Sequence, residues 1–539
     1  MSAETPVEET ITISDGRLQG LHLAESGTLA WLGIPYAMPP VGKLRWKAPR
    51  AAGPWSGILP VRDFNNSSMQ LMDGVPGGSE DCLYLNIWRP DHKETGLPVF
   101  VYLHGGGNIS GSGRDFAGEK LARETDAIII TVNYRLGALG FFRHPALRTG
   151  DPLDDLGNYG LLDILHALKW VHKNIHYFGG NPGNITLAGQ SAGARNALAA
   201  YLSPLGKGLF HKLYIMSGGL TTAPAEDGDA KANDMLKALL VQTGKVSSQE
   251  AATEWIARQS LEAVSDYLYS TQAERFAGLI RDTGLRMAAF PHLFEDGTVL
   301  PEGGFDNLHK HSHEGLPVVL GSTASEFSGF ALGDSLFSDH VHNGKLTDNM
   351  EHKLLFAAAS QYGDELYASF NAEQTAVRLT AVNPEIPVFA YRFRWGLHDG
   401  VTAPVVRFLL GAPHGADVPF YTGKYDGNYA EGVISADNEP GRSKLSSLMC
   451  QYLRHFIYTG DPNAEGLPRW RRFTGNPEYA EILSLDATEE QAVVQGEPKL
   501  FRQGILSRMM EDSRLTGEQR SWLTGQLFAD RFFWKDKTG

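Results

Sequence analysis

Cysteine is nearly absent from this chain: its 539 residues include only Cys82 and Cys450. Two thiols exclude a disulfide framework, and reduced thiols are typical of cytoplasmic proteins. The first ten residues contain three acids, no lysine or arginine and no apolar stretch, so we expect no signal peptide. No window approaches the roughly 18 consecutive apolar residues of a spanning helix. We therefore expect a cytoplasmic protein without a membrane segment.

An excess of basic residues is also missing. Lysine and arginine number 48 against 62 acidic residues, which gives a net charge of −14, and no basic run occurs. Nucleic acids bind proteins largely through basic contacts to phosphates, so we expect no nucleic-acid partner and no binding to anionic membranes. Hydrophobic residues make up 42% and charged residues 20% of the chain, as in ordinary globular proteins. We expect a monomer or small homo-oligomer.

Short β-branched runs, apolar on both faces, recur at 98–103, 127–134, 184–189, 212–218, 317–323 and 388–395. Such runs are typical of buried parallel strands. Helical periodicity lies between several of them, from Leu161 to Ile175 and over 232–243 and 443–458. This alternation predicts an α/β fold with a mostly parallel central sheet and helices on both faces. We expect a single domain over 1–539, with a helical insertion over the active site at about 220–316.

The segment Gly189-Gln190-Ser191-Ala192-Gly193 follows a predicted strand and precedes an alanine-rich helical stretch. This is the context of a G-x-S-x-G nucleophile elbow, in which a sharp turn exposes the serine hydroxyl. The turn requires very small residues two before and two after the serine, and glycine stands at both places. Ser191 is therefore the predicted nucleophile, above a helix N-terminus that favours developing negative charge.

A second glycine-rich motif, His104-Gly105-Gly106-Gly107, directly follows the predicted strand at 98–103. Glycines let backbone N–H groups approach a substrate oxygen without a Cβ in the way. Such donors stabilise a tetrahedral oxyanion, each by about 3 kcal/mol. We expect the N–H groups of Gly106, Gly107 and Ala192 to form this oxyanion hole.

With both motifs the chain resembles the type-B carboxylesterases, the cholinesterase-like branch of the α/β hydrolases. The segments that carry the resemblance lie at 178–193, 80–86, 33–46, 133–142 and 459–463. The resemblance implies the α/β-hydrolase fold and a serine mechanism that hydrolyses a small-molecule ester. Because water supplies the second half-reaction of such a mechanism, we expect neither a metal nor an organic cofactor. A lipase or a carbamate or amide hydrolase on the same machinery is the alternative. A catalytically inactive adhesion protein is disfavoured, because the nucleophile is present.

The resemblance also implies the other members of the triad. In α/β hydrolases the acid follows the serine and the histidine follows the acid. Glu326, after the run at 317–323, matches the family's acid, and His414 in GAPHGADVPF matches its base. Ser217 matches a serine that supports the acid through a hydrogen bond. The alternating His309, His311 and His313 are expected to be solvated rather than metal-bound.

Four positions depart from the family pattern. Cys82 lacks the upstream cysteine that often pairs with it, and Gln190 stands where the family usually has glutamate. Arg195 replaces a small or apolar residue one turn beyond Ser191, and it needs an anion. One alternative is a structural carboxylate such as Asp163, or a path for the side chain past the helix to solvent. The other is a carboxylate or polar acyl group of the substrate. Asn108, directly after the glycines, is a second candidate for substrate binding.

Overall fold

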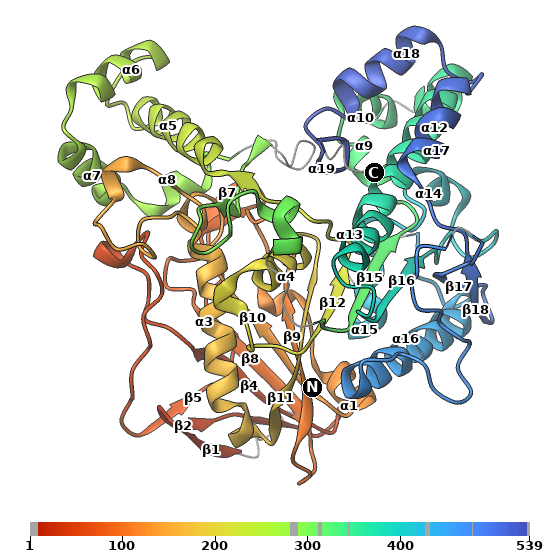
Figure 1. The fold of residues 1–539 in the computed structure, drawn as a ribbon, viewed down its shortest axis with the longest axis horizontal. Coiled ribbons are helices and arrows are strands. Elements are labelled where there is room, and N and C mark those ends of the chain that lie inside the picture. Colours follow the sequence, from red (N-terminus) through yellow and green to blue (C-terminus); the bar gives the residue numbers. More distant parts are fainter. Residues whose placement is uncertain are drawn as a thin grey trace. The chain divides into compact units, whose positions relative to one another are not determined.

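The computed structural model describes residues 9–280, 289–310, 315–342, 345–425, 432–476 and 478–535. His311 and His313 lie outside these residues, as does the side chain of His309. The chain forms two compact units, each built of strands and helices (Figure 1). The described part of the first unit is residues 9–211, 221–280 and 290–310, and the second holds residues 212–220 and those from 315 onward.

The first unit contains a run of neighbouring strands in the order β3-β4-β8-β10-β9-β11. Strand β9 is parallel to β10 and β11, whereas β8 is antiparallel to both β10 and β4. Leu103 at the end of β9 lies opposite Gly189 near the end of β11. The loop after β9 and the turn after β11 therefore leave the sheet side by side. The bounds are Leu21–Leu23 (β3), Thr28–Pro35 (β4), Tyr84–Pro90 (β8), Leu97–Leu103 (β9), Ile128–Val132 (β10) and Gly180–Gln190 (β11).

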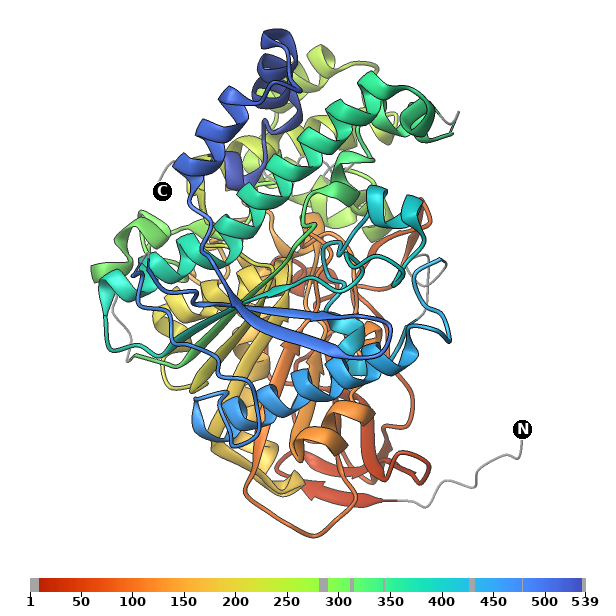
Figure 2. The same ribbon diagram turned by 90° about the vertical axis from the view of Figure 1, so that its right-hand side faces the viewer.

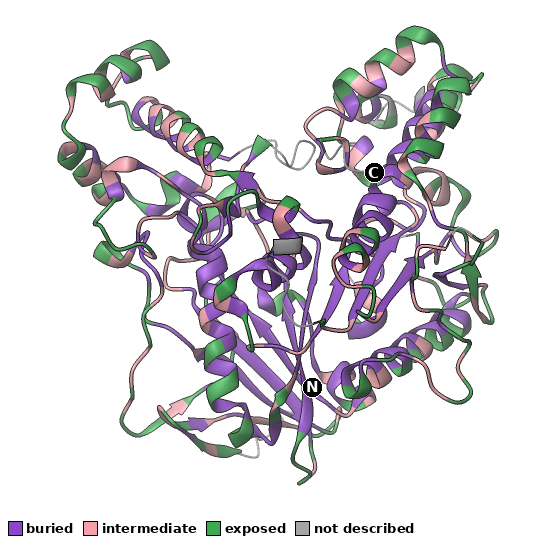
Figure 3. Cartoon of the chain, viewed as in Figure 1, coloured by how far each residue is buried: buried purple, intermediate pink, exposed green. Residues whose placement is uncertain are grey.

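Around these strands the first unit carries helices and small sheets. The helices are α1 Glu119–Thr125, α2 Gly137–Gly140, α3 Tyr159–Asn174, α4 Ala192–Leu202, α5 Ala225–Gln242, α6 Gln249–Arg258, α7 Leu261–Ser270 and α8 Ala273–Ala277. Helices α5 to α8 gather away from the small sheet of β1 (Thr10–Ile13), β2 (Gly16–Gln19) and β5 (Ile58–Pro60) (Figure 1). Most of α6 is exposed, while strands β4, β8, β9 and β10 are largely buried (Figure 3). The predicted helices from Leu161 and over 232–243 are confirmed.

The second unit has neighbouring strands in the order β12-β15-β16-β17-β18. Their bounds are Lys212–Met216 (β12), Val318–Thr323 (β15), Val388–Phe393 (β16), Ile482–Ala487 (β17) and Ala492–Glu497 (β18). All are parallel to their neighbours except β18, which forms an antiparallel hairpin with β17. Helix α16, Glu439–Thr459, lies along this hairpin (Figure 2). The predicted strands 317–323 and 388–395 and the predicted helix 443–458 are confirmed.

The remaining helices of the second unit are mostly short, apart from α12. They are α9 Ser328–Ala331, α10 Ser335–His342, α11 Lys345–Asp348, α12 Met350–Ala368, α13 Thr375–Val382, α14 Pro404–Leu409, α15 Val418–Thr422, α17 Arg502–Glu511, α18 Gly517–Trp522 and α19 Phe532–Lys535. The last of them packs Phe533 into a buried aromatic cluster with Phe327 and Phe528. Among the described helices, none combines the length and the apolar character that a membrane span requires.

Candidate active site

Ser191 has the backbone conformation that the elbow motif predicts. Its φ is 56° and its ψ is −120°, a region that a residue with a side chain rarely occupies. The turn leaves no room for a Cβ atom at either flanking glycine. A Cβ on Gly189 would lie 2.4 Å from the carbonyl carbon of Gly193, and one on Gly193 would lie 2.1 Å from the Leu103 oxygen. The requirement for glycine at both positions is therefore steric.

The hydroxyl of Ser191 stands at the start of α4. Ser191 is the N-cap residue, but its side chain makes no capping hydrogen bond. Ala192 is the first residue of the helix, so its N–H has no intrahelical acceptor. The positive end of the helix dipole lies at the same place. A hydroxyl group, a backbone N–H donor and an electric field that favours negative charge thus occur within two residues of one another.

The glycine loop after β9 lies against this turn. A Cβ on Gly105 would be 3.1 Å from the Cβ of Ser191 and 2.6 Å from Gln190 Oε1. Gly106 and Gly107 have φ of 96° and 66°, which glycine alone adopts readily. The N–H groups of Ile109 and Ser110 both donate to the Gly106 oxygen at 3.0 Å and close the loop into a tight turn. This turn aims backbone rather than side chains at the space beside Ser191.

Asn108 fixes that turn to α4. Its Nδ2 donates to Asn196 Oδ1 at 3.0 Å, and Asn196 Nδ2 donates to Asn108 Oδ1 at 2.8 Å. Both residues are fully buried. The backbone carbonyl oxygen of Asn108 accepts the N–H of Gly137 at 2.7 Å. The amide expected to face a substrate therefore has a partner within the protein, and Asn196 is a neighbour that the sequence analysis missed.

His104 is a buried, neutral support beneath the loop. Its ring stacks on Tyr134, with centroids 4.4 Å apart, and the Tyr134 hydroxyl donates to the His104 oxygen at 2.6 Å. Burial lowers the pKa of His104 to about 4, against a smaller opposing effect of its hydrogen bond to the Gly105 oxygen. The imidazole therefore stays uncharged at neutral pH and acts as packing.

Arg195 is buried on α4, but Asp163 is not its carboxylate. Asp163 is paired with Arg135, whose Nη2 and Nε lie 2.7 and 2.8 Å from its two oxygens. The suggested pairing of Arg195 with Asp163 is therefore wrong, because Arg135, which follows β10, forms the ion pair with this carboxylate. The charge of Arg195 acts instead on His292. Burial lowers the pKa of His292 to about 3, and Arg195 contributes to the shift.

In the second unit, Glu326 and His414 are hydrogen-bonded. Glu326 Oε2 contacts His414 Nδ1, while Oε1 accepts the Ser217 hydroxyl at 2.5 Å and the Thr323 N–H at 2.7 Å. Glu326 is completely buried, so three polar partners stabilise its charge. With Nδ1–H donating to the carboxylate, the tautomer leaves Nε2 as the proton acceptor. Ser217, Glu326 and His414 are thus brought together as predicted.

The loops that carry this pair are held by groups the sequence analysis missed. Ser325 N donates to the Ala412 oxygen at 3.0 Å, which joins the two loops. Asp364 of α12 accepts the N–H groups of Phe327 and Ser328 at 2.6 and 2.8 Å and the Ser328 hydroxyl at 2.7 Å. Burial raises the pKa of Asp364 to about 7. No local sequence pattern marks Asp364, because its partners lie more than thirty residues away.

The comparisons with known proteins agree with this geometry. The sequence model of the Carboxylesterase family matches residues 7–375 and 337–500. Para-nitrobenzyl esterase of Bacillus subtilis (strain 168) is 29% identical over 512 residues, which cover 91% of this chain and 97% of the relative. Carboxylesterase 5A of Canis lupus familiaris is 31% identical over 531 residues, which cover 89% and 86%. The chain belongs to the carboxylesterase family.

Solved structures of this family have the same fold. A PNB esterase superposes with a TM-score of 0.71 at 27% identity, over 92% of this chain and 99% of the esterase. The carboxylesterase described here accordingly has the α/β-hydrolase fold with a mostly parallel sheet, and it is a carboxylic-ester hydrolase. Both conclusions confirm the resemblance that the sequence motifs carried.

One group of potential metal ligands occurs among the described residues of this carboxylesterase: His92, Glu94 and Asp126. The imidazole is already engaged at both nitrogens. Nε2 lies 2.8 Å from Asp126 Oδ1, and Nδ1 accepts the Glu94 N–H at 3.2 Å. An imidazole in that state donates to the carboxylate and has no lone pair left for a cation. These contacts explain the cluster as a surface hydrogen-bond network.

Proposed function

We propose that this carboxylesterase acts through Ser191 as nucleophile, His414 as general base and Glu326 as the acid that orients the base. The strained backbone of Ser191, with its positive φ and a hydroxyl that makes no capping hydrogen bond, carries the proposal. The buried hydrogen bonds of Glu326 to His414 and Ser217 support the other two roles.

In this mechanism Ser191 Oγ attacks the ester carbonyl carbon while its proton moves to His414 Nε2. The carbonyl oxygen becomes an oxyanion that the N–H groups of Gly106, Gly107 and Ala192 stabilise. Collapse breaks the bond to the alcohol, which leaves with the proton from His414. Water then attacks the acyl-enzyme with the same base, and the carboxylic acid is released as Ser191 is regenerated.

The exposure of the glycine loop supports the oxyanion hole. Gly106 is exposed and Gly107 is partly exposed, so their backbone groups are accessible to a ligand. Gln190, whose Oε1 lies close to Gly105, is uncharged, unlike the glutamate that the family usually has at this position. The developing oxyanion therefore avoids the repulsion that a glutamate there would exert.

Covalent labelling tests the nucleophile. An organophosphate should add one equivalent to the peptide that contains Ser191 and abolish hydrolysis of an activated ester. Ser191→Ala should neither incorporate the label nor hydrolyse the ester. Ser447→Ala, on the exposed face of α16, should do both as the parent enzyme does. Labelling of another residue, or full activity of Ser191→Ala, would overturn the assignment. A matched amide in the same assay distinguishes esterase from amidase activity.

Arg195 remains a proposed substrate contact for a carboxylate in the acyl part of the ester. Its position one turn beyond Ser191 on α4 supports the idea, as does its guanidinium, which can bind a carboxylate through two hydrogen bonds. Arg195→Met should then lower kcat/KM selectively for an ester with a free acyl carboxylate, by about 2 kcal/mol in transition-state stabilisation. Equal losses on a neutral ester would make Arg195 a purely structural residue. Asn108 is proposed only as an indirect contributor, through the loop.

We further propose a cytoplasmic location, a monomer or small homo-oligomer, and one α/β-hydrolase domain formed by both units. Neither of the two buried cysteines forms a disulfide, which supports the reducing compartment. Cell fractionation and light scattering of the purified protein test the first two, and a single cooperative unfolding transition would support the third.

A further inference from the structure

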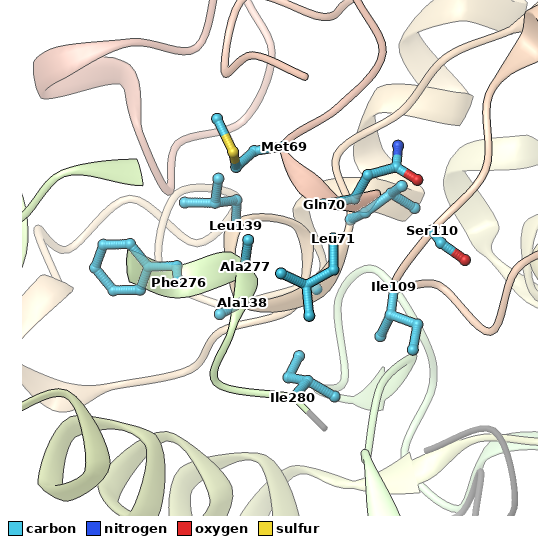
Figure 4. A pocket seen from close by; sticks show the side chains of 12 residues that line it. Met69, Gln70, Leu71, Ile109, Ser110, Ala138, Leu139, Phe276, Ala277 and Ile280 are labelled. Atoms are coloured by element: carbon cyan, nitrogen blue, oxygen red, sulfur yellow. The ribbon is translucent and has the colours of Figure 1, made fainter. Parts of the chain in front are cut away.

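A cavity of about 180 Å³ lies in the first unit, next to the glycine loop. Its walls come from three separate segments and from the loop itself. The side chains that define them are Met69 and Leu71, Ile109, Leu139, Phe276 and Ile280 (Figure 4). Phe276, Leu139 and Met69 are buried almost completely, so the walls are part of the packed interior.

The chemistry of the walls is apolar. None of the twelve lining residues is charged, and the two polar side chains are Gln70 and Ser110. The amide of Gln70 is already used: Nε2 donates to the oxygens of Ser68 and Gly111 at 3.0 Å, and Oε1 accepts the Gly111 N–H at 2.8 Å. Ser110 Oγ donates to the Gly106 oxygen at 3.3 Å. A ligand in the cavity would meet methyl, methylene and aromatic groups.

The loop that holds the proposed oxyanion donors forms one wall, and it is hydrogen-bonded to two of the other three segments. Ile109 and Ser110 donate their N–H groups to the Gly106 oxygen. Gly137, in the segment of Leu139, donates its N–H to the backbone oxygen of Asn108. Gln70, in the segment of Leu71, accepts the N–H of Gly111 through Oε1. The cavity is therefore separated from the donors by one tight turn, and its shape is coupled to theirs.

We propose that this cavity receives one uncharged apolar group of the ester, an aromatic ring or a short branched alkyl group, and so sets the size selectivity of the enzyme. The proposal rests on the proposed function. The volume suits such a group, because an apolar cavity of about 150 Å³ holds benzene. An anionic group is excluded, since the walls offer it no partner. The group belongs to either the acyl or the alcohol part of the ester.

Two variants with opposite effects on the volume of the cavity test the proposal. Ala277→Leu, at the end of α8, fills the cavity, and Ile280→Ala enlarges it; Ala251→Leu on α6 is the matched control outside it. Each is assayed on two ester series. One keeps an acetyl group and varies the alcohol from methyl to benzyl, and the other keeps a methyl alcohol and varies the acyl group from acetyl to benzoyl. A carboxylated benzyl or benzoyl ester completes each series.

Ala277→Leu should lower kcat/KM for the ring-bearing ester of one series by about tenfold or more, because a pocket discriminates by that much for each misfitting group. The methyl acetate standard should change less than twofold. Ile280→Ala should relax the preference in the same series, and Ala251→Leu should change neither. The affected series identifies which part of the ester is bound.

Equal changes on all esters, unchanged selectivity in both variants, or a loss in Ala277→Leu that is as large for the carboxylated esters as for the uncharged ring-bearing esters would overturn the proposal. These results differ from a failure of the proposed function. If the parent enzyme hydrolyses neither series, the triad is at fault; if it hydrolyses both and Ala277→Leu shifts no size preference, only the role of the cavity is wrong.

Discussion

At the scale of single residues, the amide pair of Asn108 and Asn196 joins the two segments of the proposed oxyanion hole. One asparagine follows the glycines, and the other lies on α4, five residues beyond Ser191. A reciprocal pair holds the loop at a fixed distance from the helix. Removing one partner leaves a buried amide with unmet hydrogen bonds, which costs about 1–3 kcal/mol.

Asn196→Ala should therefore lower the free energy of unfolding by about that amount and reduce kcat more than it raises KM. Asn108→Gly is the matching change, since the φ of 61° at this position suits glycine. A double-mutant cycle by chemical denaturation and steady-state kinetics checks the pair. If the two effects simply add, the amides do not act together.

Ser217 gives a second residue-scale prediction. Its hydroxyl is one of three partners of buried Glu326. Ser217→Ala should lower kcat by about tenfold, because a hydrogen bond to a charged group is worth about 1.5–3 kcal/mol. Stopped-flow measurement of acylation with an activated ester isolates the step. An unchanged acylation rate would mean that the Thr323 N–H and His414 suffice to hold the carboxylate.

Sequence alone predicts those residues whose neighbours along the chain form part of the motif. Gly189 and Gly193 identify Ser191 because the steric requirement is local. Asn196 and Asp364 are invisible, because their partners come from distant segments. The sequence also could not show which carboxylate is available to Arg195. Its charge could be recognised, but the pairing of Arg135 with Asp163 depends on how the chain packs.

At the scale of elements, strand β8 was not among the strands that the sequence predicted. Strand β8 is almost wholly buried but contains Asn86. That amide donates to Thr131 Oγ1 and accepts the Gly33 N–H, both at 2.9 Å. The hydrogen bonds satisfy the polar group inside the sheet, yet they break the apolar pattern in the sequence.

The anchoring of α9 by α12 has a pH dependence that follows from Asp364. Its pKa is about 7 in the folded protein, against a usual value of 3.8, so the folded state binds the extra proton between about pH 4 and 7. This contribution to stability is complete below about pH 4 and is lost as the pH rises through 7. The free energy of unfolding should fall by up to about 1.4 kcal/mol per pH unit in that window.

Asp364→Asn should remove this part of the slope. The amide keeps one oxygen for the two backbone N–H groups and offers an N–H to the Ser328 hydroxyl, so it resembles the protonated acid. Urea denaturation of both proteins at pH 4.5, 6 and 7.5, values chosen to span roughly that window, makes the comparison. Parallel stability curves for the variant and the parent would assign the slope to other groups.

At the scale of the whole molecule, the family assignment could be made from the sequence because its motifs lie all along the chain. The division into two compact units could not, since it depends on how many contacts each segment makes with distant ones. That the units act as one domain stays a prediction. The natural ester is also beyond the sequence, because the cavity walls come from segments about 200 residues apart.

The enzyme as a whole is expected to need no cofactor. Water completes the proposed reaction, and the triad supplies the proton transfers. Hydrolysis of an activated ester should survive exhaustive dialysis against a chelator, with metal content followed by elemental analysis. A loss that a divalent ion restores would contradict this and direct attention to the histidines at 309–313.

The burial of both thiols gives this enzyme a practical property. Burial raises the pKa of Cys82 to about 12, and Cys450 is equally inaccessible. A thiolate is the species that maleimides and disulfide reagents attack. The native protein should therefore show no fast-reacting thiol with Ellman's reagent and two after denaturation in guanidinium. A cysteine introduced at Ala277 would then be a unique attachment point for a fluorophore that reports on occupancy of the cavity, without any prior removal of native cysteines.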